Sequence, residues 1–298
     1  MNENFKAGFV TIVGKANVGK STFLNKILGE KLSIVTPKPQ TTRISIKGIY
    51  NSNDAQIIFL DTPGFIEPRY ELQNRMISHI KYSLLDSDLI IFITDITDFP
   101  TEYDTKVIDI IKQTNKPVIA ILNKVDLLNE PYVSKKVELA KSFFNKVFPY
   151  SALFAKDIEG ILKEIITDIP YNPPLYPDDN LSDLPMRFFA QEIIREKIFI
   201  NIDKEIPYAS TVLVDSYEER DTHDFIRATI YLERESQKSI ILGKEGSKIG
   251  KIRKDAEIAI SQLSGKPTKL NLWIKIKPGW RKKSGLLDIF GYNKVTMD

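Results

Sequence analysis

The sequence contains no cysteine and only two histidines among its 298 residues. Disulfide bridges and cysteine-ligated metals are therefore excluded. His79 and His223 belong to no cluster of metal ligands, and we interpret both as structural. The first residues, MNENFKAGFVTIVG, lack the apolar core of a secretory signal, and no apolar run reaches the roughly 18 residues of a membrane-spanning helix. We therefore expect a cytoplasmic protein.

Charge is nearly balanced overall, at +3, but it is uneven along the chain. Residues 1–183 carry 21 Lys and Arg against 23 Asp and Glu, whereas residues 184–298 carry 21 against 16. The stretch Lys266–Lys283 holds seven basic residues and no acidic one. A basic half is typical of proteins that bind polyanions. Taken alone, a basic stretch is equally compatible with an ordinary solvated surface.

Short apolar runs alternate with helix-length segments in the first part of the chain. Runs such as LIIFIT and VIAIL predict strands buried on both faces of a mostly parallel sheet. This pattern favours an α/β, doubly wound fold, with ligands bound at the carboxyl ends of the strands. The predicted strands are Gly8–Val13, Ile44–Tyr50, Gln56–Leu60, Leu89–Thr94, Val118–Leu122 and Val147–Tyr150, and the predicted helices are Lys20–Leu28, Leu72–Leu85, Tyr103–Gln113, Tyr132–Asn145 and Gly160–Asp168.

A proline-rich segment then separates two parts of the chain that differ in the order of their predicted helices and strands. Residues 169–185 contain five prolines, which restrict the backbone and remove donors, so we expect an extended linker. We predict a first domain over residues 1–169, a linker over 170–185 and an α+β domain over 186–298. The second domain has the predicted order α-β-β-α-α-β and a short C-terminal helix near Gly285–Phe290. Its earlier elements are Met186–Ile202, Ala209–Tyr217, Asp224–Glu233, Gln237–Leu242, Ser247–Leu263 and Leu270–Lys277.

Residues 14–21, GKANVGKS, match the phosphate-binding pattern G-x-x-x-x-G-K-[ST]. They follow a predicted strand and open a predicted helix, so backbone N–H groups and the helix N-terminus would face the phosphates. Lys20 would reach the β- and γ-phosphates, and the Ser21 hydroxyl would bind Mg²⁺. The nucleotide-binding residues predicted here are Gly14, Lys15, Ala16, Asn17, Val18, Gly19, Lys20, Ser21 and Thr22.

Three further motifs follow predicted strands. In residues 61–64, DTPG, the Asp61 carboxylate could hold the Mg²⁺ shell and the Gly64 amide could approach the γ-phosphate. In residues 123–126, NKVD, the Asp126 carboxylate could accept two N–H bonds from guanine, a donor pair that adenine lacks. In residues 151–153, SAL, a backbone N–H could bind guanine O6. The nucleotide contacts predicted from these motifs are Asp61, Thr62, Pro63, Gly64, Asn123, Lys124, Asp126, Ser151, Ala152 and Leu153.

The segment LSIVTPKPQTTRI connects the first predicted helix to the next strand. A threonine from Thr41 or Thr42 could bind Mg²⁺ and the γ-phosphate, which would order the segment only with GTP. We favour Thr42; the alternative is a simple connector in which both threonines are dispensable. The predicted metal ligands are Ser21, Thr42 and Asp61, and the predicted catalytic residues are Lys20, Thr42 and Gly64.

Together GKANVGKS, QTTR, DTPG and NKVD resemble the GTPases of the Era and tRNA-modification type. The resemblance implies a Ras-like fold that binds GTP or GDP with Mg²⁺. Phe65 follows Gly64 and has no polar group to orient water, so we expect slow hydrolysis. In similar GTPases an asparagine at the place of Asn17 helps to hold K⁺, which would add positive charge at the phosphates. The alternative is that Asn17 stabilises the loop through side-chain hydrogen bonds.

The second domain contains IILGKEGSKI at residues 240–249, a G-x-x-G loop between two predicted helices. This arrangement resembles the type II KH module, whose loop clamps about four nucleotides of single-stranded RNA. Ile240, Ile241 and Ile249 could form an apolar floor under the bases, and Arg253 could add countercharge. A lone G-x-x-G is also compatible with a simple helix–helix turn. The predicted RNA contacts are Gly243, Lys244, Glu245, Gly246, Lys248 and Lys251.

The helix sequence FFAQEIIREKIF and the strand sequence LWIKIKPGW also resemble the C-terminal domain of Era GTPases, so the resemblance covers essentially the whole chain. It implies a monomer that binds the 3′ end of 16S rRNA and acts in assembly of the small ribosomal subunit. Of the two tryptophans, we expect Trp273 in the core and Trp280 at the surface.

Two other classes of function are alternatives to an RNA-binding GTPase. A GTPase that acts mainly at a membrane or on a protein partner stays open, because Lys266–Lys283 would also suit anionic lipid on the inner face of the cell membrane. Weak peripheral membrane association could also coexist with RNA binding. A P-loop ATPase is disfavoured by Asp126. The sequence leaves open how nucleotide and RNA affinities are coupled.

Overall fold

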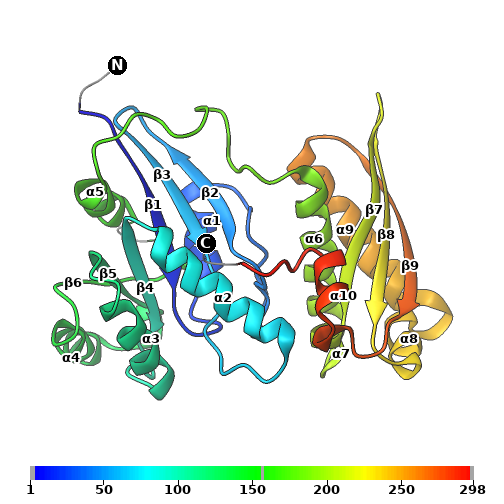
Figure 1. Ribbon diagram of the computed structural model, residues 1–298, viewed down its shortest axis with the longest axis horizontal. Helices are drawn as coiled ribbons and strands as arrows, with labels where there is room; N and C mark the ends of the chain where they lie inside the picture. The colour runs from blue at the N-terminus through cyan, green and yellow to red at the C-terminus, as the bar shows by residue number, and fades with distance from the viewer. Residues whose placement is uncertain (1–3, 156–157, 296–298) are drawn as a thin grey trace.

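The computed structural model describes residues 4–155 and 158–295. Figure 1 shows two parts side by side: a first part with a six-stranded sheet and a second part with a three-stranded sheet. The α/β architecture predicted for the first part and the α+β architecture predicted for the second are both confirmed.

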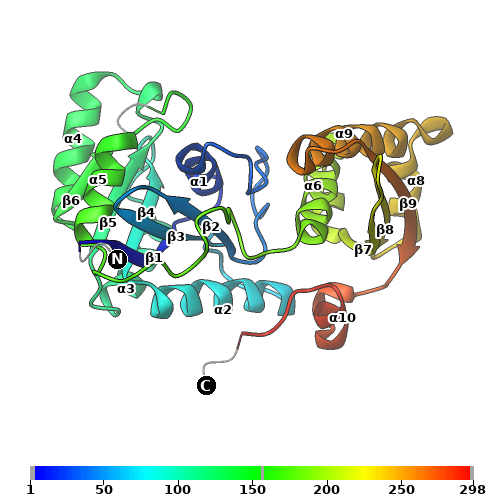
Figure 2. The same cartoon turned by 90° about the horizontal axis from the view of Figure 1, so that it is seen from above.

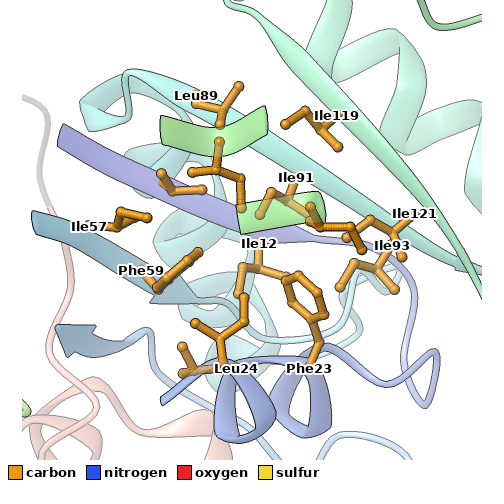
Figure 3. Close-up of a cluster of buried hydrophobic side chains, with 14 of the residues drawn as sticks. Ile12, Phe23, Leu24, Ile57, Phe59, Leu89, Ile91, Ile93, Ile119 and Ile121 are labelled. Carbon is orange, nitrogen blue, oxygen red and sulfur yellow. The ribbon is translucent and has the colours of Figure 1, made fainter. Parts of the chain in front are cut away.

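The first part is a sheet with the strand order β2-β3-β1-β4-β5-β6, in which only β2 runs antiparallel to its neighbour. Alternate residues of the central strands enter two apolar cores on opposite faces, which explains the continuous apolar runs. Figure 3 shows Phe23 and Leu24 pointing from the first helix onto one face. The elements are β1 (Lys6–Val13), α1 (Lys20–Leu28), β2 (Ile46–Asn51), β3 (Ala55–Asp61), α2 (Glu71–Asp86), β4 (Leu89–Asp95), α3 (Glu102–Lys112), β5 (Val118–Asn123), η1 (Val125–Leu127), α4 (Glu130–Lys141), β6 (Lys146–Pro149) and α5 (Ile158–Asp168).

The second part is a sheet with the order β7-β8-β9, in which β7 and β8 are antiparallel and β8 and β9 are parallel. Helices α6 and α9 pack together on one face of this sheet (Figure 2). The elements are α6 (Met186–Asn201), α7 (Ile206–Ala209), β7 (Thr211–Glu219), β8 (Asp224–Leu232), α8 (Glu235–Leu242), η2 (Lys244–Gly246), α9 (Ser247–Ser264), β9 (Thr268–Ile276), η3 (Trp280–Lys282) and α10 (Ser284–Ile289).

The proline-rich segment between the two parts lies along the edge of the larger sheet. The backbone N–H of Ile49 in β2 donates to the carbonyl of Leu181 at 2.9 Å. Lys47, also in β2, forms an ion pair with Asp183 at 2.7 Å. The segment therefore covers the free edge of β2, which would otherwise expose unpaired backbone groups.

The C-terminal segment returns to the first part and packs against α2 (Figure 2). Arg75 in α2 is buried and donates hydrogen bonds to Asp288, to the Tyr292 carbonyl and to Ser284. The apolar side of this interface consists of Leu72, Met76, Tyr231, Trp280, Leu287, Phe290 and Tyr292. The two parts are therefore joined by a packed interface in addition to the linker.

The two tryptophans lie the opposite way round from the sequence expectation, which was wrong. Trp280 is fully buried, and its indole N–H donates to the Ala209 carbonyl at 2.9 Å. Trp273 is 46% exposed on β9. Because the alternating residues of β9 face α9 on one side only, Trp273 falls on the open side. Trp280 is buried by α10 and by the first part, long-range contacts that sequence periodicity does not reveal.

Removing the buried indole should destabilise the fold. Trp280→Ala should lower the free energy of unfolding by about 3–5 kcal/mol, through lost burial and a cavity. Urea denaturation followed by far-UV circular dichroism measures this loss. The matched variant Trp273→Ala removes a half-exposed indole and should cost less than about 1 kcal/mol. Equal losses in the two variants would contradict this placement.

Candidate functional site

The predicted phosphate loop lies between β1 and α1, with its backbone curled around the N-terminus of the helix. Gly19 has φ 100°, and a Cβ there would lie 2.3 Å from Asn123 Nδ2, so only glycine fits. Lys20 folds back over the loop and donates to the carbonyls of Gly14 at 3.2 Å and Lys15 at 2.9 Å. Burial lowers the pKa of Lys20 to about 8, an effect partly offset by Asp61. A phosphate beside this ammonium would favour its charged form.

The three predicted metal ligands meet at one point although they come from α1, the following loop and β3. Ser21 Oγ donates to Asp61 Oδ2 at 2.6 Å and lies 3.2 Å from Thr42 Oγ1. Thr41 also lines this pocket, but its hydroxyl is engaged by the loop, because it donates to the Lys38 carbonyl at 2.8 Å and lies 2.6 Å from Thr36 Oγ1. The geometry thus supports Thr42 over Thr41 as the ligand.

The chemistry of this point fits Mg²⁺. Asp61 is fully buried, and its Oδ1 has no hydrogen-bond partner among the described residues. Burial raises the pKa of this carboxyl, against the opposing effects of Ser21 and Lys20, and a divalent cation would favour the carboxylate. Across residues 4–155 and 158–295, no three His, Asp or Glu side chains gather as a metal cluster. Mg²⁺ would thus be held by hydroxyls, one carboxylate, water and phosphate oxygens, a set that it prefers.

The DTPG segment closes against the phosphate loop. The Phe65 N–H donates to the Gly14 carbonyl at 3.0 Å. A Cβ on Gly64 would lie 2.7 Å from Ala16 Cα, so the close approach requires glycine. The Thr62 hydroxyl donates to the Ile12 carbonyl at 2.7 Å, so it faces β1 and not the nucleotide pocket. Thr62 therefore supports the strand end, whereas Gly64 reaches the pocket.

The predicted guanine site is built on Asn123. Its Nδ2 donates to the Val18 carbonyl at 2.7 Å, and its Oδ1 accepts from the Ala152 N–H at 2.9 Å. This buried amide thus joins the phosphate loop to the SAL segment. Ser151 Oγ donates to the Asp126 carboxylate, which fixes the predicted base-reading group.

Lys124 and Leu153 complete this side of the site. Lys124 has φ 68° and forms an ion pair with Asp95 at 2.7 Å, which holds its stem along the pocket. Since the Ala152 N–H already donates to Asn123, the N–H groups of Ser151 and Leu153 are the SAL candidates for guanine O6. The Leu153 side chain itself is exposed.

A cavity of about 300 Å³ lies among these motifs. Of the predicted residues, it is lined by Ala16, Asn17, Gly19, Lys20, Ser21, Thr22, Thr42, Gly64 and Lys124. Its wall also includes side chains that sequence reasoning missed, from the loop between α1 and β2: Ile34, Val35, Thr36, Pro37 and Gln40. They belong to no motif, and only the closure of the loop over α1 brings them to the pocket.

The same loop is fastened to the second part by Arg43, which follows Thr42 directly. The Arg43 guanidinium is buried at 3% exposure. It donates to the carbonyls of Ser210 at 2.9 Å, Pro207 at 3.1 Å and Tyr208 at 3.2 Å, and to the Tyr292 hydroxyl at 3.1 Å. The sequence contains this residue within QTTR but gives no indication of its partners.

Two more contacts fasten the loop to α6. Lys38 Nζ donates to the carbonyls of Phe199, at 2.7 Å, and Ile202. Glu196 accepts from Lys31 Nζ at 2.9 Å and from the Val35 N–H at 3.1 Å. Burial opposes ionisation of Glu196, but these donors, with Lys197, hold its pKa below the ordinary value. The loop therefore has one side on the nucleotide pocket and the other on α6.

The G-x-x-G loop has the backbone that its sequence predicts. Gly243 has φ 70° and Gly246 φ 77°, and a Cβ on Gly243 would lie 2.8 Å from Lys248 Cγ. Lys244, Lys248 and Lys251 are all exposed around it, as polyanion contacts must be. The loop ends at the N-terminus of α9, which adds positive potential.

A groove of about 420 Å³ runs from this loop to β9. Ile249 lines it, as predicted. Ile241 is instead fully buried in the core, and Ile240 is 45% exposed and does not line the groove, so the expectation was wrong for both. The whole β9 wall was missed, because only the fold brings β9 beside α9. The lining residues are Gly246, Ile249, Gly250, Arg253, Asn271, Leu272 and Trp273.

The fold and these two sites define a P-loop GTPase joined to a KH domain. Residues 9–124 match the family described as 50S ribosome-binding GTPase, and residues 205–281 match the KH domain. GTPase Era of Staphylococcus haemolyticus (strain JCSC1435) is 39% identical over 290 residues, which cover 96% of this chain and 97% of that protein. The chain therefore belongs to the Era GTPase family.

Two solved structures share the complete fold. An Aquifex aeolicus Era variant bound to GDP·AlF₄⁻ matches with a TM-score of 0.94 and 37% identity, covering 97% of this chain and 100% of that one. Era in complex with MgGDPNP and nucleotides 1506–1542 of 16S ribosomal RNA also matches with a TM-score of 0.94 and 37% identity, over 97% and 99%. None of the described helices is long and apolar enough to cross a membrane.

The guanine site can be tested at its carboxylate. Asp126→Asn should weaken GTP binding at least about tenfold, because a charged acceptor for two N–H groups is replaced by a neutral amide. Titration with a fluorescent GTP analogue measures the dissociation constant. Glu159→Gln, the same chemical change at an exposed residue at the start of α5, should have no effect. Unchanged affinity in Asp126→Asn would exclude this residue as the base-reading group.

Proposed function

We propose that this chain is a GTP-hydrolysing switch that binds the 3′ end of 16S rRNA and acts in assembly of the small ribosomal subunit. The observation that carries this proposal is the G-x-x-G loop and its groove, joined in one molecule to the nucleotide pocket through Arg43. The homologous complex with 16S nucleotides 1506–1542 supports the choice of RNA.

The roles of the nucleotide-site residues belong to the same proposal. Ser21, Thr42 and Asp61 would hold Mg²⁺, which supplies positive charge at the phosphates when bound. Lys20 and the Gly64 amide would bind the γ-phosphate, and Asp126 would select guanine. Intrinsic hydrolysis should be slow, because the position after Gly64 is Phe65, whose ring packs edge-on against Tyr103 at 6.5 Å.

On this proposal, GTP controls RNA binding through the loop between α1 and β2. The γ-phosphate would hold Thr42 in the pocket, and Arg43 would transmit that position to α7 and the C-terminal segment. Helix α6, which the same loop contacts, packs against α9, which carries the RNA loop. We further propose that the protein is a cytoplasmic monomer divided into a GTPase domain (1–169), a linker (170–185) and a KH domain (186–298).

The RNA ligand and the switch can be tested together. A short RNA from the 3′ end of 16S rRNA should bind the protein loaded with a GTP analogue more tightly than the protein loaded with GDP. Gly243→Asp/Gly246→Asp should abolish binding in both states, because carboxylates would face the phosphates. The control Gly160→Asp/Gly285→Asp adds the same charge at two glycines with open space around them and should bind normally.

Each outcome has a distinct meaning. Binding that ignores the nucleotide would overturn the switch but keep the RNA site. Absence of RNA binding in any state, with binding to anionic vesicles instead, would support action at a membrane through the basic stretch Lys266–Lys283.

We also propose that Asn17 helps to hold K⁺ beside the phosphates. Asn17 lines the nucleotide cavity, and its Nδ2 donates to the Pro37 carbonyl at 2.8 Å, so the amide oxygen would be the ligand atom. GTP turnover should be at least about tenfold faster in K⁺ than in Na⁺, because a cation there offsets developing charge. Asn17→Ala should abolish the difference. Equal wild-type rates in the two salts would exclude the role and leave Asn17 as a loop-stabilising residue.

A further inference from the structure

The sheet of the KH domain has one covered face and one face that is largely open. Residues of β8 and β9 that point toward α6 and α9 are apolar and buried or partly buried. Because side chains alternate along a strand, the intervening residues occupy the opposite face. On β8 and β9 these are Phe225, Arg227, Thr229, Tyr231, Lys269, Asn271, Trp273 and Lys275. We call this set the outer sheet face.

The C-terminal segment covers only one end of the outer sheet face. Tyr231 packs against Phe290 at a ring distance of 4.7 Å and is 8% exposed. Toward the other end, Arg227 and Asn271 are exposed and Trp273 is 46% exposed. An indole exposed to this extent on an edge strand leaves a flat apolar surface available to a partner.

The open end combines aromatic rings with basic groups. The guanidinium of Arg220 lies 4.4 Å and that of Arg227 5.3 Å from the centre of the Phe225 ring. Lys269 is the cross-strand neighbour of Phe225. Glu218 pairs with both arginines, at 2.6 and 3.4 Å, and so offsets part of their charge.

Trp273 lies at the other side of the same basic surface. Its cross-strand neighbour is Thr229, a small residue whose hydroxyl donates to Asp215 at 2.8 Å. In the described part of the chain, no acidic side chain pairs with Lys269 or with Lys275, which flank this surface along β9. Basic groups therefore exceed acidic groups across the outer sheet face.

We propose that the outer sheet face is a second RNA-binding surface, which receives the single-stranded RNA that leaves the G-x-x-G groove across β9. Trp273 connects the outer sheet face with the G-x-x-G groove, because it also lines that groove. Bases stack on Trp273 and Phe225, while Arg227, Lys269 and Lys275 contact phosphates. This inference rests on the RNA-binding function proposed above.

Single-stranded RNA is favoured because it alone uses both features of the surface. Phosphates match the unpaired lysines, and unstacked bases match the exposed Trp273 indole and the half-buried Phe225 ring. Along the strand direction Phe225 and Thr229, the neighbour of Trp273, are about 13 Å apart, so the two rings would contact different nucleotides. The G-x-x-G loop holds only about four nucleotides, which leaves the rest of a longer RNA to find contacts elsewhere.

RNAs of two lengths distinguish binding in the G-x-x-G groove from binding on the outer sheet face. An RNA of about four nucleotides fills the loop groove, and one of about twelve nucleotides extends beyond it. Arg227→Glu and Lys269→Glu should each weaken the longer RNA at least about fivefold and leave the shorter unchanged. Phe225→Leu, which keeps an apolar side chain but removes the ring, should also weaken only the longer RNA. Fluorescence anisotropy measures all four proteins, and thermal melting checks that they are folded.

The control is Lys163→Glu, the same charge reversal at an exposed lysine of α5 in the GTPase domain. It should bind both RNAs like the unmodified protein, and an equal loss in this variant would overturn the proposal in favour of a general charge effect. Unchanged binding of the longer RNA to Arg227→Glu and Lys269→Glu would overturn it as well. So would lost binding to anionic vesicles with RNA binding intact, which would assign the surface to lipid. If the short RNA fails to bind the unmodified protein, the loop function fails, while the longer RNA still tests this face.

Discussion

Thr42 and Arg43 are neighbours in the chain, but their side chains hold the nucleotide pocket and the KH domain respectively. The Thr42 hydroxyl lies 3.2 Å from Ser21 in the nucleotide pocket. The buried Arg43 guanidinium donates four hydrogen bonds to α7, to Ser210 and to Tyr292. A buried guanidinium that loses its acceptors carries a large desolvation penalty, so Arg43 and its partners should move together. A change at Thr42 thus has a physical route into the KH domain.

A second contact joins the segment that follows DTPG to the KH domain. This segment leads into α2, and Arg75 of α2 is held by the C-terminal residues Asp288 and Tyr292. Both segments that line the predicted γ-phosphate site are therefore fixed to the KH domain, one through α6 and α7 and one through the C-terminal segment. Because binding free energies are linked, any effect of GTP on RNA affinity must be matched by an equal effect of RNA on GTP affinity.

The local parts of the fold and the site could be predicted from the sequence. The phosphate loop, DTPG and NKVD each place their chemistry within a few residues at the end of a strand, and the structure brings Ser21, Thr42 and Asp61 together. Contacts made by the folded chain could not be predicted. In the sequence, Arg43 cannot be distinguished from other basic residues. Its role follows only from α7 and the C-terminal segment, which surround it in the structure.

The same limit explains the wrong expectations for the two tryptophans and for the isoleucines of the RNA groove. Apolar residues were assigned by type and by neighbouring sequence, but their position depends on which face of an element is covered. Ile241 points into the core of the KH domain and not into the RNA groove. Trp280 follows Pro278-Gly279 and precedes three basic residues, but it is enclosed by α10 and the first part of the chain. Only the tertiary arrangement determines these positions.

The central claim is that Arg43 carries the coupling between nucleotide and RNA. Its most direct test is the ratio of RNA affinities in the GTP-analogue and GDP states, measured for the unmodified protein and for Arg43→Lys. Lysine keeps the charge but cannot reproduce the planar set of hydrogen bonds. Arg43→Lys should still bind nucleotide and RNA, but with a ratio that falls toward one. A ratio unchanged from the unmodified protein would contradict it.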